Sequence, residues 1–189
     1  MKKLPYGISD YERIVENDYY YIDKTMYIEK LENLPEPYIM FLRPRKFGKT
    51  LFTSTIENYY DINKKEKFQE LFGETYIGKN PTKLKNSYYI LRFNFSGIDT
   101  TNEETTIKGF QKKIMSSVRM FVEKYELDFY INAEDEAENI LNNLIKAFNI
   151  QKADKKIYVI IDEYDYFANE LLGFKTNHLT YKKQIKRYM

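Results

Sequence analysis

The segment Arg43-Pro44-Arg45-Lys46-Phe47-Gly48-Lys49-Thr50 gives the first indication of how this 189-residue chain is built. It follows the apolar run Tyr38–Leu42, which we expect to be a short strand buried on both faces of a parallel sheet. From Gly48 onward apolar residues recur at helical spacing, which predicts a helix ending near Tyr60. A strand, a short loop and a helix in this order predict an α/β fold.

Gly48-Lys49-Thr50 in this context is typical of a loop that binds phosphate groups. Backbone N–H groups and the positive end of the helix face the phosphates in such a loop. Gly48 permits close approach of the backbone, Lys49 reaches the β and γ phosphates, and the Thr50 hydroxyl completes a Mg²⁺ shell. The usual first glycine is replaced by Arg43, so the segment alone is also compatible with an ordinary loop.

Asp162 and Glu163 provide a second motif. They follow the apolar run Ile157–Ile161, which we expect to be a buried strand. The first acid at such a strand end can hold Mg²⁺ through water, and the second can polarise an attacking water. The alternative is that both acids merely terminate the strand. A phosphate loop followed by an acidic strand end favours the nucleotide interpretation.

Helices and one further strand are predicted between these motifs. Asp23 is placed to cap a helix over Thr25–Leu31. Tyr88–Phe95 reads as a strand. The stretch 61–86 is helical at first, with Phe68, Leu71 and Phe72 spaced for one face, and becomes a loop at Gly78–Pro81. Further helical patterns cover about Glu103–Tyr125 with Thr101 or Asn102 as cap, and Ala133 to about Ile150 with the apolar stripe Ile140, Leu141, Leu144, Ile145 and Phe148.

Composition excludes several classes of site. The chain has no Cys and one His, so it has no disulfide framework, no cysteine nucleophile, no Cys-rich zinc site and no histidine metal cluster. Its longest uninterrupted apolar runs have five residues, whereas about 20 are needed to cross a bilayer. A net charge of +2 leaves no overall basic footprint for nucleic acid. We therefore expect a cytoplasmic protein without a membrane partner.

Four segments resemble successive signatures of a bacterial family, the AAA-ATPase-like domain. They are Leu4–Tyr11, Tyr20–Thr25, Leu42–Thr50 and Ile160–Asp165. The family is a P-loop NTPase domain that is usually fused to a PD-(D/E)XK-type nuclease domain. Its members typically carry Arg in place of the first loop glycine, so Arg43 supports the resemblance. Lys46 and Thr50 stand where Arg and Ser are common, and both are compatible with the same chemistry.

The resemblance implies a P-loop NTPase three-layer sandwich with a parallel sheet. Residues 1–36 would be a lead-in segment packing on the core, and residues 37–189 would be the NTPase core. Related ATPases place a further strand between the acidic strand and the P-loop strand. No apolar strand pattern follows Asp162 here, so we expect the sheet to be incomplete at the C-terminus and the core to be truncated after the acidic strand.

The resemblance also assigns ATP and Mg²⁺ as cofactors. Lys49 and Glu163 would be catalytic, and Thr50 and Asp162 would hold the metal. The nucleotide-binding residues would be Arg43, Pro44, Arg45, Lys46, Phe47, Gly48, Lys49 and Thr50. We expect at least one of Arg43 and Arg45 to face the phosphates or the acidic strand end, because a guanidinium offers bidentate contacts to either.

The leading prediction is an ATP–Mg²⁺-binding domain, the N-terminal part of a larger ATPase/nuclease-type protein, with weak or no hydrolysis as an isolated chain. The alternatives are a non-hydrolysing nucleotide-binding or protein-interaction module and the ATPase half of a DNA-processing enzyme. The basic tail Lys175–Arg187 could contact nucleic acid or an acidic partner, although a solvated helix face is favoured. His178 is expected at the surface. One ring of Tyr19–Tyr21 could cover adenine, with at least two packing in the core.

Overall fold

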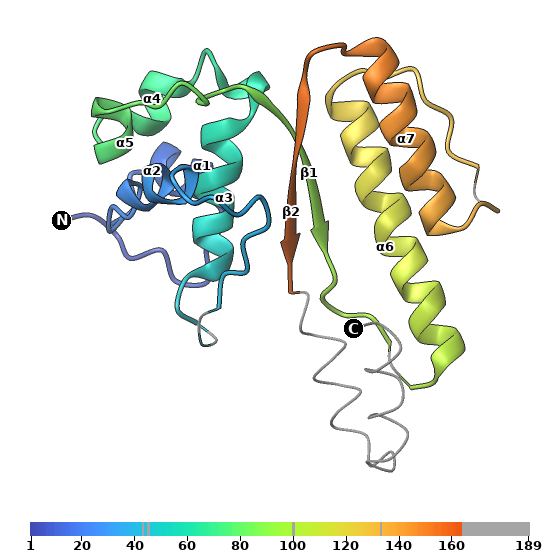
Figure 1. Cartoon of the computed structure of the whole chain (residues 1–189). Coiled ribbons are helices and arrows are strands. Elements are labelled where there is room, and N and C mark those ends of the chain that lie inside the picture. The colour runs from blue at the N-terminus through green and yellow to red at the C-terminus, as the bar shows by residue number, and fades with distance from the viewer. Residues whose placement is uncertain (43, 45, 100, 133, 164–189) are drawn as a thin grey trace. The chain divides into compact units, whose positions relative to one another are not determined.

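A computed structural model describes residues 1–42, 44, 46–99, 101–132 and 134–163. In these residues the chain is a mixed α/β protein whose strands β1 and β2 form a two-stranded parallel sheet (Figure 1). In chain order the elements are α1 (Tyr11–Glu16), α2 (Met26–Glu32), α3 (Lys49–Tyr60), a 3₁₀ turn (Ile62–Lys64), α4 (Phe68–Phe72), α5 (Tyr76–Lys79), β1 (Tyr88–Asn94), α6 (Glu103–Lys124), α7 (Ala137–Gln151) and β2 (Lys156–Asp162).

The chain divides into two compact units. Unit 1 consists of Met1–Leu91 and Lys152–Ile160 and holds helices α1 to α5. Unit 2 consists of Arg92–Gln151 and the residues from Ile161 onward, and it holds helices α6 and α7. The division falls within both strands, so each unit includes part of β1 and part of β2.

Aromatic side chains form the core of unit 1. Tyr11, Tyr59 and Phe72 are fully buried, and the Phe72 ring lies 5.0 Å from the Tyr11 ring and 5.5 Å from the Tyr59 ring between centroids. The Tyr11 hydroxyl donates to the Leu71 carbonyl at 2.6 Å, and the Tyr11 N–H donates to Ser54 Oγ at 2.9 Å. Burial raises the pKa of Tyr11, so this hydroxyl stays a protonated donor. Helix α1 is thereby attached to α3 and α4.

Asp23 does not cap α2 as the sequence predicted. Helix α2 begins after Thr25, whose own backbone is already helical, and it has no side-chain cap. Asp23 Oδ2 instead accepts the Tyr76 N–H at 2.7 Å, and the buried Thr25 hydroxyl accepts the Ile77 N–H at 3.1 Å. Asp23 Oδ1 accepts the Thr25 N–H and hydroxyl. This pair of side chains therefore satisfies N–H groups at the start of α5, a tertiary role that no local pattern shows.

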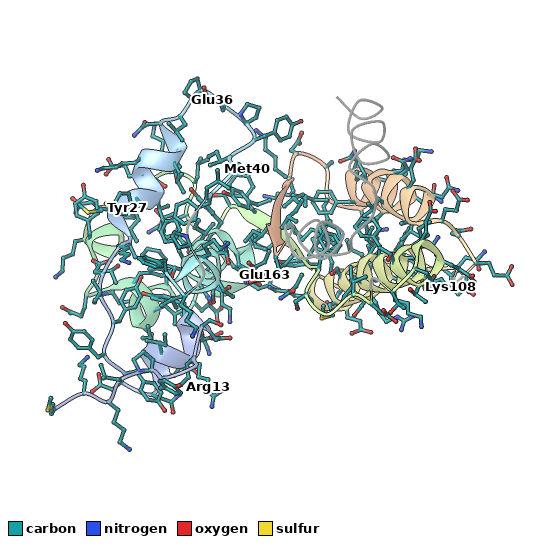
Figure 2. All side chains as sticks on the ribbon, turned by 90° about the horizontal axis from the view of Figure 1, so that it is seen from below. Arg13, Tyr27, Glu36, Met40, Lys108 and Glu163 are labelled. Atoms are coloured by element: carbon teal, nitrogen blue, oxygen red, sulfur yellow. The ribbon has the colours of Figure 1, made fainter. Side chains whose placement is uncertain are left out.

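The strand predicted over Tyr38–Leu42 is not formed. Tyr38 is 91% exposed and Met40, labelled in Figure 2, is 68% exposed. Phe41 alone in this run is half-buried, with its ring centroid 5.3 Å from that of Phe52. A strand needs a hydrogen-bonded neighbour, and in the described part of the chain neither β1 nor β2 pairs with this segment.

Strand β2 is formed as predicted, but only one of its faces is buried. Ile160 and Asp162 are buried, whereas Val159 and Ile161 are about half exposed. The expectation of a buried strand is therefore met on only one face of β2. The three-layer sandwich stays a prediction.

Helices α6 and α7 pack together in unit 2. Asn102 caps α6 through a capping box with Thr105, one of the two caps that the sequence predicted. The buried residues of the pair are Ile114, Ser117, Val118 and Phe121 on α6 and Ile140, Leu144 and Phe148 on α7. Ile145, predicted in the stripe, is half exposed, and the predicted start of α7 at Ala133 lies outside the described residues. Within those residues, no helix has both the length and the apolar character that a membrane span requires.

Candidate functional site

The loop before α3 contains two residues with left-handed backbones, one on each side of Phe47. Lys46 and Gly48 both have left-handed backbones, with φ of 66° and 76°, and the Phe47 N–H donates to the Pro44 carbonyl at 3.4 Å. Glycine adopts such a conformation without steric cost. Alternation of this kind turns successive N–H groups toward one side, where they can cradle an oxyanion. Arg43 and Arg45, both predicted to contact a ligand, lie outside the described residues.

Helix α3 starts at Lys49 with its first turn open to a ligand. Gly48 is the N-cap, and no side chain caps the helix. The helix is 12 residues long, so its N-terminus carries a positive partial charge that favours an anion. Within the described residues, the Lys49 ammonium and the Thr50 hydroxyl make no hydrogen bond or ion pair, and both side chains are half-buried. Gly48, Lys49 and Thr50 can therefore all contact a phosphate group placed at this turn.

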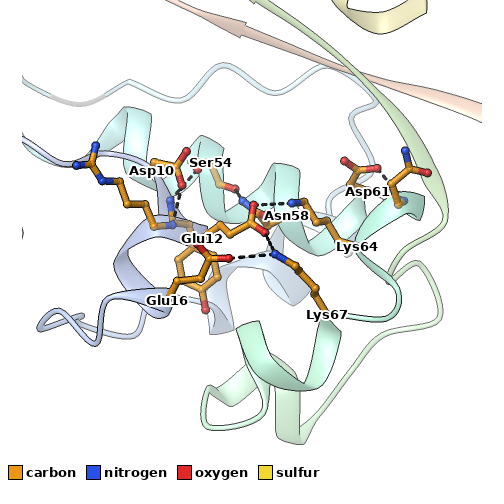
Figure 3. A network of polar contacts seen from close by, with 11 residues as sticks. Asp10, Glu12, Glu16, Ser54, Asn58, Asp61, Lys64 and Lys67 are labelled. Carbon is orange, nitrogen blue, oxygen red and sulfur yellow. Dashed lines mark hydrogen bonds and ion pairs between the residues drawn. The ribbon is translucent and has the colours of Figure 1, made fainter. Parts of the chain in front are cut away.

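An ion-pair network joins α1 to the chain that follows α3 (Figure 3). The Glu12 carboxylate accepts from Lys64 Nζ and, at 2.8 Å, from Lys67 Nζ, which also contacts Glu16 at 3.0 Å. Burial alone would raise the pKa of Glu12, but the hydrogen bonds and charges of Lys64 and Lys67 outweigh it and hold that pKa below its usual value. Together with the Tyr11–Ser54 hydrogen bond, this network ties the helix that follows the loop to the N-terminal segment.

The acidic strand end belongs to unit 2. Asp162 is the last residue of β2 and is 4% exposed. Its Oδ2 accepts from Arg92 Nη2 at 2.9 Å, its Oδ1 accepts from the Glu163 N–H at 3.1 Å, and its carbonyl accepts from the Phe95 N–H at 3.2 Å. Glu163, labelled in Figure 2, has a left-handed backbone with φ of 53°, an uncommon conformation for a residue other than glycine. The buried carboxylate is thus held by two contacts, and the backbone carbonyl of the same residue by a third.

Arg92 is the residue of this group that sequence reasoning missed. It lies in β1, in the otherwise apolar stretch Tyr88–Phe93. A signal was present, because a charged residue in the middle of a buried strand requires a charged or polar partner. Asp162, at the end of another predicted strand, was an available candidate.

Thr50 of unit 1 and Asp162 of unit 2 each carry an oxygen of the kind that Mg²⁺ binds. Mg²⁺ bound with a nucleotide takes one or two protein oxygens and completes its shell with phosphate oxygens and water. The Thr50 hydroxyl and the Asp162 carboxylate are oxygens of this kind. The described residues contain no cluster of three or more His, Cys, Asp or Glu that could hold a metal by itself.

The smaller sequence predictions have mixed outcomes. Tyr21 packs in the core of unit 1, with its ring centroid 5.1 Å from that of Tyr11, while Tyr19 is half-buried and Tyr20 is 51% exposed. A contact of one of these rings with adenine stays a prediction. His178 and the tail Lys175–Arg187 lie outside the described residues.

Comparison with known proteins supplies the family. The profile of a family described as "Predicted AAA-ATPase" matches residues 5–189. A protein of Azotobacter chroococcum mcd 1 named "Uncharacterized protein in vnfD 5'region" is 43% identical over 63 residues, which are 33% of this chain and 12% of that protein. This chain thus matches only a small part of that relative's length. No solved structure matches. Because the family profile covers nearly the whole chain and includes both the loop and the acidic strand end, the chain belongs to the AAA-ATPase-like family.

Proposed function

We propose that this domain binds ATP together with Mg²⁺ through the loop Arg43–Thr50. The observation that carries the proposal is the left-handed Gly48 at the start of α3, a helix of 12 residues without a side-chain cap. Such a helix start offers N–H groups and a positive partial charge to phosphates. Membership of the AAA-ATPase-like family gives independent support for a nucleotide as the ligand.

The proposed roles follow from the charge and reach of each side chain. Lys49 contacts the β and γ phosphates as a point charge, and the Thr50 hydroxyl and the Asp162 carboxylate are the protein oxygens offered to Mg²⁺. Mg²⁺, when bound, offsets charge on the phosphates. Glu163 orients and activates water for hydrolysis. A three-layer core and a nuclease domain in the same protein belong to this proposal through the family resemblance alone, and a cytoplasmic location belongs to it through the composition of the chain.

A second candidate is a module that binds a nucleotide without hydrolysing it. It is favoured by the contacts of Asp162, whose two carboxylate oxygens already accept from Arg92 and from the Glu163 N–H. The Glu163→Gln variant separates the two candidates in a phosphate-release assay. Loss of a measurable rate in this variant supports hydrolysis, and the same background release from both proteins supports the binding module.

Titration with a fluorescent ATP analogue tests nucleotide binding. Replacing Lys49 by Ala removes the charge assigned to the β and γ phosphates, so we expect affinity to fall at least tenfold, about 1.4 kcal/mol. The exposed Lys83, replaced by Ala, is the matched control for loss of one positive charge from unit 1. The affinity of Lys83→Ala for the ATP analogue should equal that of the wild type. Equal affinities of wild type and Lys49→Ala would remove the proposal.

A further inference from the structure

Unit 2 has a pocket between the N-terminal part of helix α6 and the loop that follows β1. Its volume is about 400 Å³, within the range of roughly 300 to 1,000 Å³ that is typical of sites for small ligands. The loop contributes residues 97–99, and α6 contributes residues between positions 105 and 113. All of these residues belong to unit 2, so one unit alone forms the pocket.

Two glycines line this pocket and leave backbone accessible in it. A Cβ built on Gly109 would lie 2.8 Å from the Ile98 Cγ2 methyl, so helix and loop approach each other closely at this position. Gly97 has a left-handed backbone with φ of 70°, and a Cβ built on it would meet no atom within 4 Å. The loop and the helix therefore both present a stretch of wall without a side chain.

Three lysines of α6 line the pocket, and two of them have no counter-ion. Lys108, labelled in Figure 2, pairs with Glu104 one turn earlier at 2.5 Å. Within the described residues, Lys112 and Lys113 make no hydrogen bond or ion pair. No acidic residue stands three or four positions from either of them, which is the spacing of ion pairs along a helix. Both ammonium groups are therefore available to a ligand.

Asp99 is the only acidic residue among the described residues that line the pocket. The Thr101 hydroxyl and the Thr101 N–H, the latter at 2.9 Å, donate to its Oδ1 and hold the pKa of Asp99 below its usual value. Three ammonium groups against this one carboxylate leave an excess of positive charge in the lining. In the described part of the chain, the N–H groups of Gly97 and Asp99 make no hydrogen bond, so each can donate to an oxyanion.

We propose that this pocket binds a small molecule through a phosphate group. Lys112 and Lys113 supply positive charge, and the loop supplies backbone donors, a combination that suits a compact anion with more than one negative charge. The inference goes beyond the proposed function, because none of these residues belongs to the loop Arg43–Thr50 and no nucleotide is required.

The test follows two backbone amides of the pocket as inorganic pyrophosphate is added to the full chain. Ser96 is the only serine that precedes a glycine, and Lys108 is the only lysine that does. Labelling Ser or Lys with ¹³C at the carbonyl and Gly with ¹⁵N therefore selects the amide signal of Gly97 or of Gly109. We expect both signals to shift and saturate at millimolar pyrophosphate, and to stay in place with sodium chloride of equal ionic strength.

Replacing the unpaired lysines tests the assigned contacts. We expect Lys112→Ala and Lys113→Ala each to raise the half-saturating pyrophosphate concentration by about threefold or more, as expected for loss of one partly exposed charge contact. The exposed Lys146 on α7 does not line the pocket, and its replacement by Ala is the matched control for loss of one positive charge from unit 2. Lys146→Ala should leave that concentration unchanged.

Four results would overturn the inference. The Gly97 and Gly109 signals could stay in place at millimolar pyrophosphate, or shift equally with sodium chloride. The half-saturating concentration could be unchanged in both Lys112→Ala and Lys113→Ala, or rise as much in Lys146→Ala. The signals could shift with a short single-stranded DNA and not with pyrophosphate. Lys49→Ala could abolish the shifts, which would assign them to the loop of unit 1.

The same labelling separates this inference from the proposed function. A Gly48 amide signal that does not respond to nucleotide would remove the proposed function and leave the phosphate pocket intact. Gly97 and Gly109 signals that do not respond to pyrophosphate would remove the pocket and leave nucleotide binding at Gly48 intact.

Discussion

At the scale of single residues, the partly buried carboxylate of Glu12 stabilises the contacts between the N-terminal segment and the part of the chain around α3, the helix that follows the loop. It lies on α1 and contacts Lys64 and Lys67, which follow α3 in the chain. Because these contacts lower its pKa, the folded protein binds a proton at Glu12 less readily than the unfolded chain does. The resulting stabilisation is fully present above the unfolded-state pKa and is lost as the pH falls through the lower folded-state pKa.

Replacing Glu12 by Gln should therefore destabilise the protein at neutral pH and much less in acid. We expect a loss of about 0.5 to 1 kcal/mol in the free energy of unfolding at pH 7, since solvent still reaches the network. The difference from wild type should shrink below about pH 4. Urea unfolding at pH 7 and in acid measures both values, with the exposed Glu70→Gln as control. A difference that is constant with pH would contradict the assigned ion pairs.

Asp23 and Arg92 mark the limit of residue-level prediction. Asp23 stands before a helical pattern and so reads as the cap of α2, yet its contact with the Tyr76 N–H depends on a partner distant in the sequence. Arg92 and Asp162 are likewise distant in the chain, and their pairing becomes visible only when β1 and β2 are neighbours. The residue types of Asp23 and Arg92 indicate that each needs a polar or charged partner, but they do not identify that partner.

At the scale of elements, short-range patterns predicted most of the longer helices and both strands of the sheet, but they missed α1 and α5 and predicted a strand over Tyr38–Leu42 that is not formed. Helix α3 starts at the predicted loop, and α6 starts at a predicted cap, because both signals are local. A strand exists only with its neighbours, so an apolar run is a weaker signal. Strands β1 (Tyr88–Asn94) and β2 (Lys156–Asp162) pair with each other. The segment Tyr38–Leu42 has no strand neighbour in the part of the chain that the structure describes.

The short helix α5 is the element most sensitive to a single added methyl group. A Cβ built on Gly78 would lie 1.7 Å from the Phe72 carbonyl oxygen, and this backbone atom cannot rotate away. On Gly109 of α6 the nearest atom would be the Ile98 Cγ2 methyl at 2.8 Å, a side-chain atom rather than a backbone atom. Alanine substitutions at Gly78 and Gly109 therefore compare a contact with a backbone atom and a contact with a side-chain atom, both at glycines within helices.

We expect Gly78→Ala to cost about 3 kcal/mol or more, because the backbone of α4 or α5 must shift. Gly109→Ala should change stability by less than about 1 kcal/mol, since the gain in helix propensity offsets the close contact. Thermal unfolding followed by circular dichroism compares both with wild type. A melting temperature for Gly78→Ala equal to that of wild type would show that α4 and α5 do not pack as described.

At the scale of the whole molecule, the family and the mixed α/β class follow from a few separated motifs. The loop could be predicted because its chemistry lies in consecutive residues. The ion-pair partner of Asp162 could not be predicted, because it is Arg92 from another strand. The boundary between units could not be predicted either, because it falls within both strands, where no change in composition marks it.

The proposed function requires that phosphates of a nucleotide contact the backbone at Gly48. The chain has seven glycines, of which only Gly48 and Gly73 follow a phenylalanine. Labelling Phe with ¹³C at the carbonyl and Gly with ¹⁵N therefore selects the amide signals of these two residues in a carbonyl-filtered spectrum. Gly73 ends α4 in the same unit and serves as the internal control. On titration with Mg²⁺-ADP, the proposal predicts that the Gly48 signal shifts and saturates while the Gly73 signal stays; a Gly48 signal that does not move at millimolar nucleotide would contradict it.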